Sequence, residues 1–264
     1  MNIRDIEYSR HFLVLSDGVH FPHSALQLAA QLARGSEKGL ALVSLNDQPD
    51  PAFDARAEQF GAACGAPFGQ WRVQGGIDDV IDLTERTETP ILLIETTPKG
   101  GFSKPMRFFK GLRELRIPFI LVKAGAEIHP LDKVVVPVGY LVEEREKAPY
   151  TSNMGRFLHS EIILLEANDY GSKTPRNIQE MTALYDKFNL RYQVVKARKD
   201  SFKVEREACQ KAGELQAGLA VFSTSRDYGL DDLLFGPKEL DAYLRCPVPA
   251  MFINPRKDLY VLCW

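Results

Sequence analysis

The tetrapeptide Leu115-Arg116-Ile117-Pro118 recurs as Leu244-Arg245-Cys246-Pro247, close to half of the 264-residue chain further on. Each copy leads into a short apolar run, residues 118–122 and 248–253, of the kind that forms a buried parallel strand. A self-match at this spacing predicts that one domain is duplicated along the chain.

Strands and helices are predicted to alternate through both halves. Short apolar runs that end at turn residues indicate buried strands, and segments with apolar residues on one face indicate helices. The predicted strands are residues 11–15, 40–45, 70–73, 91–94 and 118–122 in the first half, and 133–138, 162–166, 192–195, 219–222 and 248–253 in the second. This alternation is typical of α/β domains with a parallel sheet.

Two domains are expected, residues 1–125 and 130–264, because the segment 124–132 between them contains Gly125 and Pro130 and lacks apolar periodicity. In the first domain, Ser24 is predicted to be the N-cap of the first helix. In the second domain, the charged segment 142–157 predicts a solvated helical turn broken by Pro149, with a lid over a cleft as the alternative.

The composition indicates a globular chain without a dominant charge. Hydrophobic residues make up 45% of the chain and charged residues 26%, and 33 basic against 35 acidic residues leave a net charge of -2. This balance excludes a largely disordered chain and provides no overall field to attract nucleic acid or an anionic membrane. The four cysteines lie far apart, and no stretch approaches the roughly 18 apolar residues of a membrane helix. We therefore expect a cytosolic protein with neither nucleic acid nor membrane as a partner.

The loop after the first strand of each half is where a ligand is expected, because ligands of parallel α/β sheets bind beyond the carboxyl ends of the strands. Ser16-Asp17-Gly18 follows the first strand, and Asp17 is placed to accept hydrogen bonds from a ribose or a base. A simple turn built from Asp and Gly explains the triplet equally well. In the second half the corresponding loop has Gly139 and no carboxylate.

With these features the chain resembles tandem universal stress proteins over nearly its whole length. The resemblance implies two tandem open five-stranded parallel sheets flanked by helices, a Rossmann-like α/β fold of the adenine nucleotide alpha hydrolase type, in a family that often binds ATP. The family's phosphate loop reads Gly, two residues, Gly, nine residues, Gly and Ser or Thr, and residues 221–237 align with it. Ser223, Arg226 and Pro237 replace two glycines and the hydroxyl, and three aspartates in the segment would repel phosphate. The ATP site of the second domain is therefore expected to be degenerate.

The corresponding segment of the first half differs in charge. Glu95 and Pro98 stand at the first two glycine positions, and Phe108-Phe109 stand at the last glycine and the hydroxyl. The basic residues from position 99 to 116 are Lys99, Lys104, Arg107, Lys110, Arg113 and Arg116, against the acidic Glu114. One interpretation is an anion site. A solvated basic helix face is the stronger alternative, and a nucleic-acid surface is the weakest of the three.

A small anionic ligand is therefore expected in the first domain, if in either. The candidate ligand-binding residues are Asp17, Gly18 and Val43 near the ends of the first two strands, and Lys99, Gly100, Gly101, Ser103 and Lys104 in the basic segment. ATP or another anionic nucleotide is a candidate for the first domain only.

Nothing in the sequence demands an enzyme. The ATP pyrophosphatases of this sheet type need a Ser-Gly-Gly-x-Asp-Ser loop, which the Ser16-Asp17-Gly18 stretch does not supply. Asp17, His20 and His23 share one loop, which indicates a polar turn more than a metal site. We expect a non-enzymatic binding or regulatory protein with no catalytic residue, metal or required cofactor. An ATP-binding stress protein with slow hydrolysis is the alternative.

The resemblance also bears on assembly. Single-domain members of the family pair through their final strand, so residues 118–122 and 248–253 are expected to form that interface within one chain, as a pseudo-dimer. The C-terminal segment 259–264 is apolar throughout and would expose Tyr260 and Trp264 together as a free tail. We expect it to pack on the body of the chain or on a second copy in a homodimer.

Deletion of residues 258–264 tests this expectation. If the segment is packed, its removal lowers the thermal midpoint or changes the oligomer seen by light scattering. An unchanged midpoint together with an unchanged oligomer contradicts it.

Overall fold

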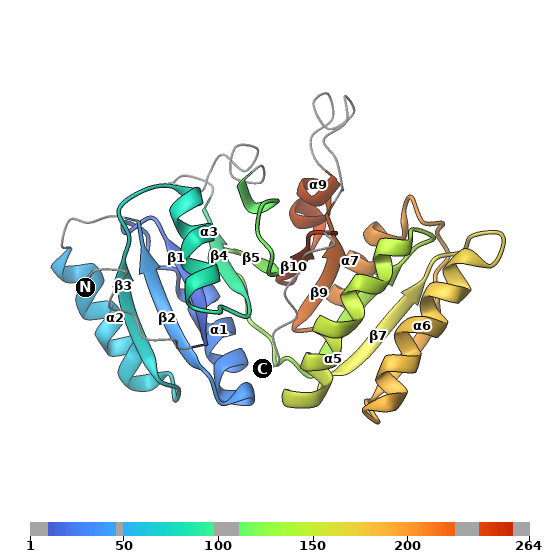
Figure 1. Cartoon of the computed structure of the whole chain (residues 1–264), viewed down its shortest axis with the longest axis horizontal. Coiled ribbons are helices and arrows are strands. Elements are labelled where there is room, and N and C mark those ends of the chain that lie inside the picture. Colours follow the sequence, from blue (N-terminus) through green and yellow to red (C-terminus); the bar gives the residue numbers. More distant parts are fainter. Residues whose placement is uncertain (1–9, 46–49, 98–110, 225–237, 256–264) are drawn as a thin grey trace. The chain divides into compact units, whose positions relative to one another are not determined.

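The chain divides into two compact units, with the boundary between Ala126 and Glu127. The structure is a computed structural model, and it describes residues 10–45, 50–97, 111–224 and 238–255 (Figure 1). Unit 1 comprises the described residues up to Ala126, and unit 2 those from Glu127 onward. The boundary lies within the segment 124–132 that separates the two expected domains.

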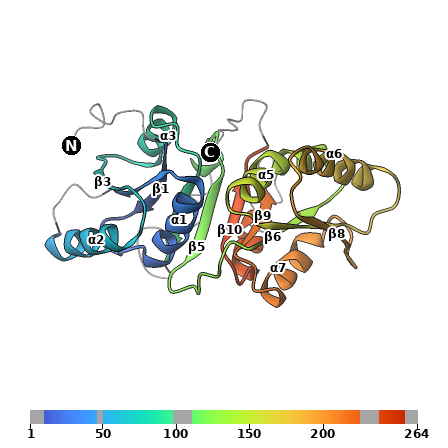
Figure 2. The same cartoon turned by 90° about the horizontal axis from the view of Figure 1, so that it is seen from below.

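Unit 1 is an open parallel sheet with strand order β3-β2-β1-β4-β5. The strands are β1 (His11–Ser16), β2 (Gly39–Ser44), β3 (Phe68–Arg72), β4 (Leu92–Thr96) and β5 (Phe119–Lys123), and the helices are α1 (His23–Ser36), α2 (Pro51–Ala63) and α3 (Ile77–Arg86). Helices α1 and α2 cover one face and α3 the other (Figure 2). The order places β1 beside β4, and Leu13 pairs with Leu92. The connections leave in opposite directions there, which creates a crevice at the carboxyl ends of these strands.

Unit 2 repeats this topology. The strands are β6 (Lys133–Val138), β7 (Glu161–Glu166), β8 (Tyr192–Lys196), β9 (Leu219–Ser223) and β10 (Ala250–Ile253), and the helical elements are η2 (Val142–Glu146), α5 (Lys147–Phe157), α6 (Lys173–Lys187), α7 (Val204–Glu214) and α9 (Lys238–Arg245). The order β8-β7-β6-β9-β10 places β6 beside β9. Figure 2 shows α5 and α6 on one face of this sheet and α7 on the other. The predicted α/β fold with five parallel strands in each unit is confirmed.

The central strands form the cores because helices cover both of their faces. In β1, Phe12, Leu13, Val14 and Leu15 are fully buried, and the same holds for Leu219, Ala220 and Val221 in β9. Parallel strands buried on both faces have continuous apolar sequences, which is why these strands can be predicted from the sequence.

The segment 142–157 corrects the prediction made for it. It forms η2 and a regular helix, α5, rather than a solvated turn broken by Pro149. Pro149 lies in the first turn of α5, where a backbone N–H has no helical acceptor to lose. Most of the first half of α5 is buried, including Lys147, Tyr150 and Thr151. A lid is therefore not what this segment forms.

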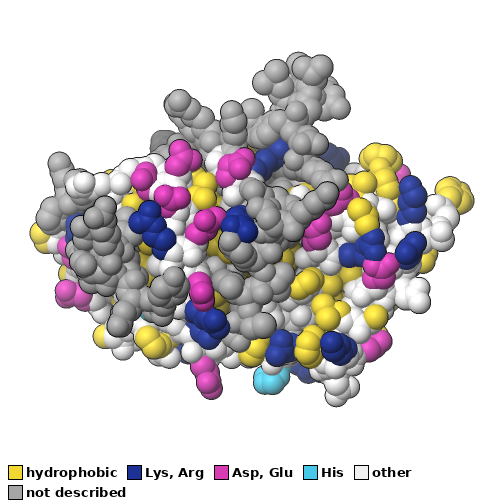
Figure 3. Space-filling model, in the orientation of Figure 1, with side chains coloured by type: hydrophobic (Ala, Val, Ile, Leu, Met, Phe, Trp, Pro, Cys, Tyr) yellow, Lys and Arg dark blue, Asp and Glu magenta, His cyan; other side chains and the backbone are white. Residues whose placement is uncertain are grey.

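Figure 3 shows acidic and basic side chains interspersed on the face that it presents. No described helix has the length and apolar content needed to cross a membrane. Cys64, Cys209 and Cys246 are buried free thiols.

Candidate functional site

The site predicted for unit 1 is only partly described. Asp17, Gly18 and Val43 lie within the described residues, whereas Lys99, Gly100, Gly101, Ser103 and Lys104 lie outside them. The phosphate-loop positions 225–237 of unit 2 also lie outside. The basic-segment hypothesis therefore stays a prediction. The described residues include the strand ends that precede these two segments.

Asp17 holds its own loop together. Its Oδ1 accepts hydrogen bonds from the N–H groups of Val19 at 2.9 Å and His20 at 2.8 Å. Its Oδ2 lies 2.9 Å from Nδ1 of His20. Gly18 adopts a positive φ of 78° that a turn requires, and its N–H donates to Ser16 Oγ. Asp17 thus stabilises a polar turn, its contact with a ligand stays a prediction, and the side chain of Val43 is fully buried in the core.

A second carboxylate, that of Glu95, lies in the crevice between β1 and β4. Glu95, near the end of β4, is 8% exposed, and its Oε2 accepts the N–H of Ala25 at 3.0 Å in the first turn of α1. Glu95 therefore takes the capping role predicted for Ser24, whose Oγ instead donates to the carbonyl of Ala126. The free space around Asp17, His20 and Glu95 is about 10 Å³. That is scarcely room for one water molecule.

Burial raises the pKa of Glu95. Hydrogen bonds from the backbone of Ala25 and Ser24 and the nearby His23 offset part of this rise. A carboxylate at a helix N-terminus occupies the place that a phosphate would take, because the same N–H groups and helix dipole attract either anion.

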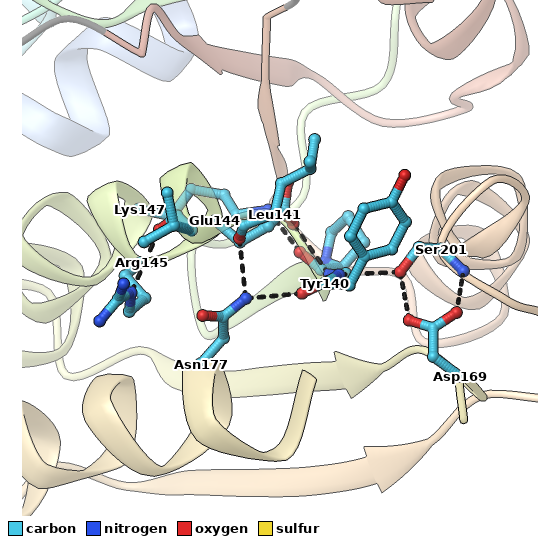
Figure 4. Close-up of polar contacts among 11 residues, drawn as sticks. Tyr140, Leu141, Glu144, Arg145, Lys147, Asp169, Asn177 and Ser201 are labelled. Atoms are coloured by element: carbon cyan, nitrogen blue, oxygen red, sulfur yellow. Dashed lines mark hydrogen bonds and ion pairs between the residues drawn. The ribbon is translucent and has the colours of Figure 1, made fainter. Parts of the chain in front are cut away.

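In unit 2 the loop after β6 is fixed by a different carboxylate. Glu144 of η2 is buried, and its Oε2 accepts the N–H of Gly139 at 3.0 Å and the Nζ of Lys147 at 2.7 Å (Figure 4). Lys147 is 1% exposed and also donates to the carbonyl of Pro137. Asn177 Nδ2 donates to the carbonyls of Gly139 at 2.8 Å and Leu141 at 2.7 Å. The backbone of this loop is satisfied by protein groups.

Gly139 has no space for a side chain. A Cβ at this position would lie 2.7 Å from the Oγ of Ser201. That hydroxyl is held in place: it accepts the N–H of Tyr140 at 2.9 Å and donates to Asp169 (Figure 4). The position that corresponds to Asp17 therefore has no carboxylate, and Ser201 occupies the space that a side chain would need there.

Asp169, in the loop after β7, is the carboxylate that orders this region. Its Oδ1 accepts the N–H of Ser201 at 3.0 Å, and its Oδ2 accepts the hydroxyl of Thr174 at 2.7 Å. Burial alone would raise the pKa of Asp169, but the hydrogen bonds from Ser201 and Thr174 outweigh it and lower the pKa below the usual range.

The predicted metal alternative has no support from the geometry. His20 faces Asp17, whereas the ring of His23 packs against Phe60 with centroids 6.4 Å apart. Within the described ranges, no group of three His, Cys, Asp or Glu side chains has the arrangement of a metal site.

The residues that fix the loop after β6 were not predicted from the sequence; they are Glu144, Lys147, Asp169 and Ser201. Ser201 hydrogen-bonds to Asp169 across 32 positions, and such a pairing leaves no local pattern in a single sequence. Glu144 and Lys147 belong to the charged segment that was predicted to be solvated. Their three-residue spacing on a helical segment is the sequence feature that could have indicated an ion pair.

Substitutions at Glu95 test the capping role. Glu95→Gln keeps an oxygen acceptor for Ala25 and removes the buried charge, whereas Glu95→Ala removes both. We expect Glu95→Ala to be about 1 kcal/mol less stable than Glu95→Gln, as for other helix N-caps. Because the folded state raises the pKa of Glu95, the wild type gains stability as the pH falls through that raised pKa, and it approaches Glu95→Gln. Urea unfolding at neutral and mildly acidic pH measures this; equal stability of the two variants contradicts the cap.

A double-mutant cycle tests the contact of Gly139 with Ser201. Gly139→Ala should cost about 1–3 kcal/mol, because the added methyl meets a fixed hydroxyl. In the Ser201→Ala background the cost should fall by at least about 0.5 kcal/mol, the lower bound for residues in contact. Gly155→Ala, in α5 and close to the flexible Leu190 side chain, is the control and should have one effect in both backgrounds. Additive costs at Gly139 would rule the contact out.

Comparisons with known proteins identify the fold. No protein-family model and no curated protein matches the sequence. A universal stress protein from Archaeoglobus fulgidus DSM 4304 is similar in structure, with a TM-score of 0.68, 13% identity, and coverage of 95% of this chain and 100% of that chain. A protein of unknown function from Pseudomonas aeruginosa PAO1 has a TM-score of 0.61 and 15% identity, over 93% of this chain and 92% of that one.

A third similar structure comes from a different kind of protein. It is the cytoplasmic domain of a prokaryotic cation chloride cotransporter, with a TM-score of 0.55 and 14% identity, over 95% of this chain and 98% of that chain. At these identities the likeness concerns the fold. The chain has the fold of a tandem universal stress protein.

Proposed function

We propose that this chain is a non-enzymatic binding or regulatory protein that does not bind ATP in the manner of the universal stress proteins. One observation supports the proposal most: in each unit a buried protein carboxylate accepts a backbone N–H at the carboxyl edge of the sheet, where ligands of this fold bind. Glu95 takes the N–H of Ala25 in unit 1, and Glu144 takes the N–H of Gly139 in unit 2. An anionic nucleotide at this edge could not use these two donors and would meet a negative charge.

The absence of catalysis is part of the proposal. Ser201 lies in the segment before α7, and the hydrogen-bond partners of its hydroxyl are the Asp169 carboxylate and the N–H of Tyr140. Activation of a hydroxyl as a nucleophile needs a base that takes its proton at working pH. Asp169, with its lowered pKa, is a poor base. The described part of the site therefore favours binding over chemistry.

A second candidate function is the binding of a phosphate-bearing small molecule by unit 1. The observation that favours it is the basic segment 99–116, with Lys99, Gly100, Gly101, Ser103 and Lys104 as the proposed ligand-binding residues. Slow ATP hydrolysis would additionally require a complete phosphate loop. A cytosolic location, the pseudo-dimer through residues 118–122 and 248–253, and a homodimer remain proposals drawn from the sequence.

Calorimetry of the full chain with magnesium ATP tests the principal proposal. We expect no dissociation constant below the millimolar range, because Ser223, Arg226 and Pro237 replace two glycines and the hydroxyl of the family's phosphate loop, and two such losses cost on the order of 1–3 kcal/mol each. A micromolar constant would overturn the proposal.

A thermal-shift screen with phosphorylated metabolites tests the second candidate. A ligand at about 100 times its dissociation constant adds about 2.7 kcal/mol to the stability of the folded chain. Any stabilisation in unit 1 should disappear in Lys99→Glu/Lys104→Glu and persist in the control Lys173→Glu/Lys187→Glu, which exchanges two exposed lysines of α6. Persistence in both variants would place the ligand elsewhere.

A further inference from the structure

Unit 2 has a cavity at the outer edge of its sheet, between the end of the edge strand β8 and the helix α7. Its volume is about 350 Å³, in the range of small-molecule sites. The lining includes Val195, Arg198 and Lys199 from β8 and the loop after it, and Glu207, Gln210 and Lys211 from α7. None of the described lining residues belongs to β6 or β9, so this cavity is separate from the crevice between those two strands.

Basic side chains outnumber acidic ones in the lining of this cavity. Two of its lysines have a carboxylate nearby: the Nζ of Lys196 lies 2.8 Å from Glu166, and the Nζ of Lys211 lies 3.7 Å from Glu214. Among the described residues, no ion pair involves the side chain of Arg198 or Lys199. These two cationic groups are therefore available to an anionic ligand.

The remaining carboxylate of the lining, Glu207, holds the backbone that carries the two cations. Both of its oxygens accept the N–H of Arg198, at 2.9 and 3.0 Å, and its Oε2 also accepts the N–H of Lys199 at 2.9 Å. The carbonyl of Lys199 accepts the N–H of Asn168 at 2.8 Å. Glu207 is thus stabilised by backbone donors, and Arg198 and Lys199 extend from a loop of fixed conformation. Such a loop lowers the ordering cost of binding.

The corresponding loop of unit 1 has no cations at these two positions. Arg72 ends β3 as Lys196 ends β8, because each pairs with the last residue of the neighbouring strand, Ser44 and Glu166. Gln74 and Gly75 therefore stand where unit 2 has Arg198 and Lys199. The connection from strand to helix forms in both units, so the fold does not require the two cations. Their presence beside a cavity favours a role in binding.

We propose that this cavity binds a small organic dianion, a phosphate monoester or a dicarboxylate. Its charged groups are held by Arg198 and Lys199, and its carbon skeleton lies against Val195. The planar guanidinium of Arg198 matches either oxyanion with two parallel hydrogen bonds, and the ammonium of Lys199 contributes a second positive charge. The side-chain amide of Gln210 provides a neutral donor. The inference goes beyond the proposed loss of ATP binding and does not depend on it.

Calorimetry of the full chain with phenyl phosphate and with succinate tests the proposal. It is carried out at low ionic strength and at about pH 8, where both probes carry two charges. The neutral counterparts are benzyl alcohol and succinamide. We expect at least one dianion to bind with a millimolar or tighter dissociation constant, and its neutral counterpart to bind at least tenfold more weakly. Added sodium chloride should weaken the dianion, because salt screens exposed charges.

Two results of this titration overturn the proposal. One is the absence of saturation by both dianions. The other is a neutral counterpart that binds within tenfold of its dianion, because the charges of Arg198 and Lys199 would then not select the ligand.

Variants locate the site. Arg198→Gln and Lys199→Gln each remove one charge and keep the backbone N–H that Glu207 accepts. We expect each to weaken the tighter dianion by about three- to tenfold, and the double variant to weaken it more than either. The matched control is Lys173→Gln/Lys187→Gln, which removes two charges from exposed lysines of α6 on the other face of the sheet (Figure 2). Its affinity should equal that of the wild type.

Thermal midpoints equal to the wild type show that these variants remain folded. Unchanged affinity in Arg198→Gln/Lys199→Gln, or an equal loss in the control, overturns the assignment. Binding that is lost in Lys99→Glu/Lys104→Glu and kept in Arg198→Gln/Lys199→Gln would place the ligand in unit 1, and it likewise overturns the assignment.

Discussion

Backbone N–H groups at the carboxyl edge of a parallel sheet need acceptors, and in this chain protein carboxylates supply them. The first turn of a helix leaves N–H groups without helical partners, and a loop that leaves a buried strand does the same. Glu95 meets this need at α1, and Glu144 meets it after β6. Both acceptors are tethered to the fold, so they compete with any dissolved anion at high effective concentration. In the described part of the chain, these two donors are therefore already bonded to protein groups.

The two carboxylates are accommodated by different means. Glu95 has no ion pair with a cation among the described residues, and burial raises its pKa. Glu144 is paired with Lys147, and this lysine is itself buried and bonded to the carbonyl of Pro137. A buried ion pair gains little over an apolar substitute, but removal of one partner leaves an uncompensated charge. We therefore expect the stability of unit 2 to depend on both charges of the Glu144–Lys147 pair, and that of unit 1 to depend on the oxygen acceptor of Glu95 more than on its charge.

The fold could be predicted from the sequence because the patterns that indicate it are local. Buried parallel strands have continuous apolar runs, and the repeated Leu-Arg-x-Pro stretch precedes β5 and β10 in the two units. The candidate site was harder to predict because its hydrogen bonds join residues that are far apart in the sequence, such as Ser201 and Asp169. Ser24 is of a residue type that often caps helices, yet the N–H of Ala25 in the first turn of α1 is bonded to Glu95 from β4. Pro149 resembles a helix breaker, but the first turn of α5 accommodates it.

One fold does not imply one function, and the two units illustrate how a site changes on a constant frame. The same architecture occurs in a stress protein and in the cytoplasmic domain of a transporter, at 13% and 14% identity to this chain. In unit 1, Asp17 and Glu95 leave almost no free space between β1 and β4. In unit 2, Ser201 fills the position beside Gly139, and a cavity beside the loop after β6 lies towards the start of α7, with aromatic rings and a carboxylate at its border. The contacts that satisfy the backbone of the loop after β6 also place Tyr140 beside Phe202, because Ser201, which accepts the N–H of Tyr140, directly precedes Phe202 in the chain.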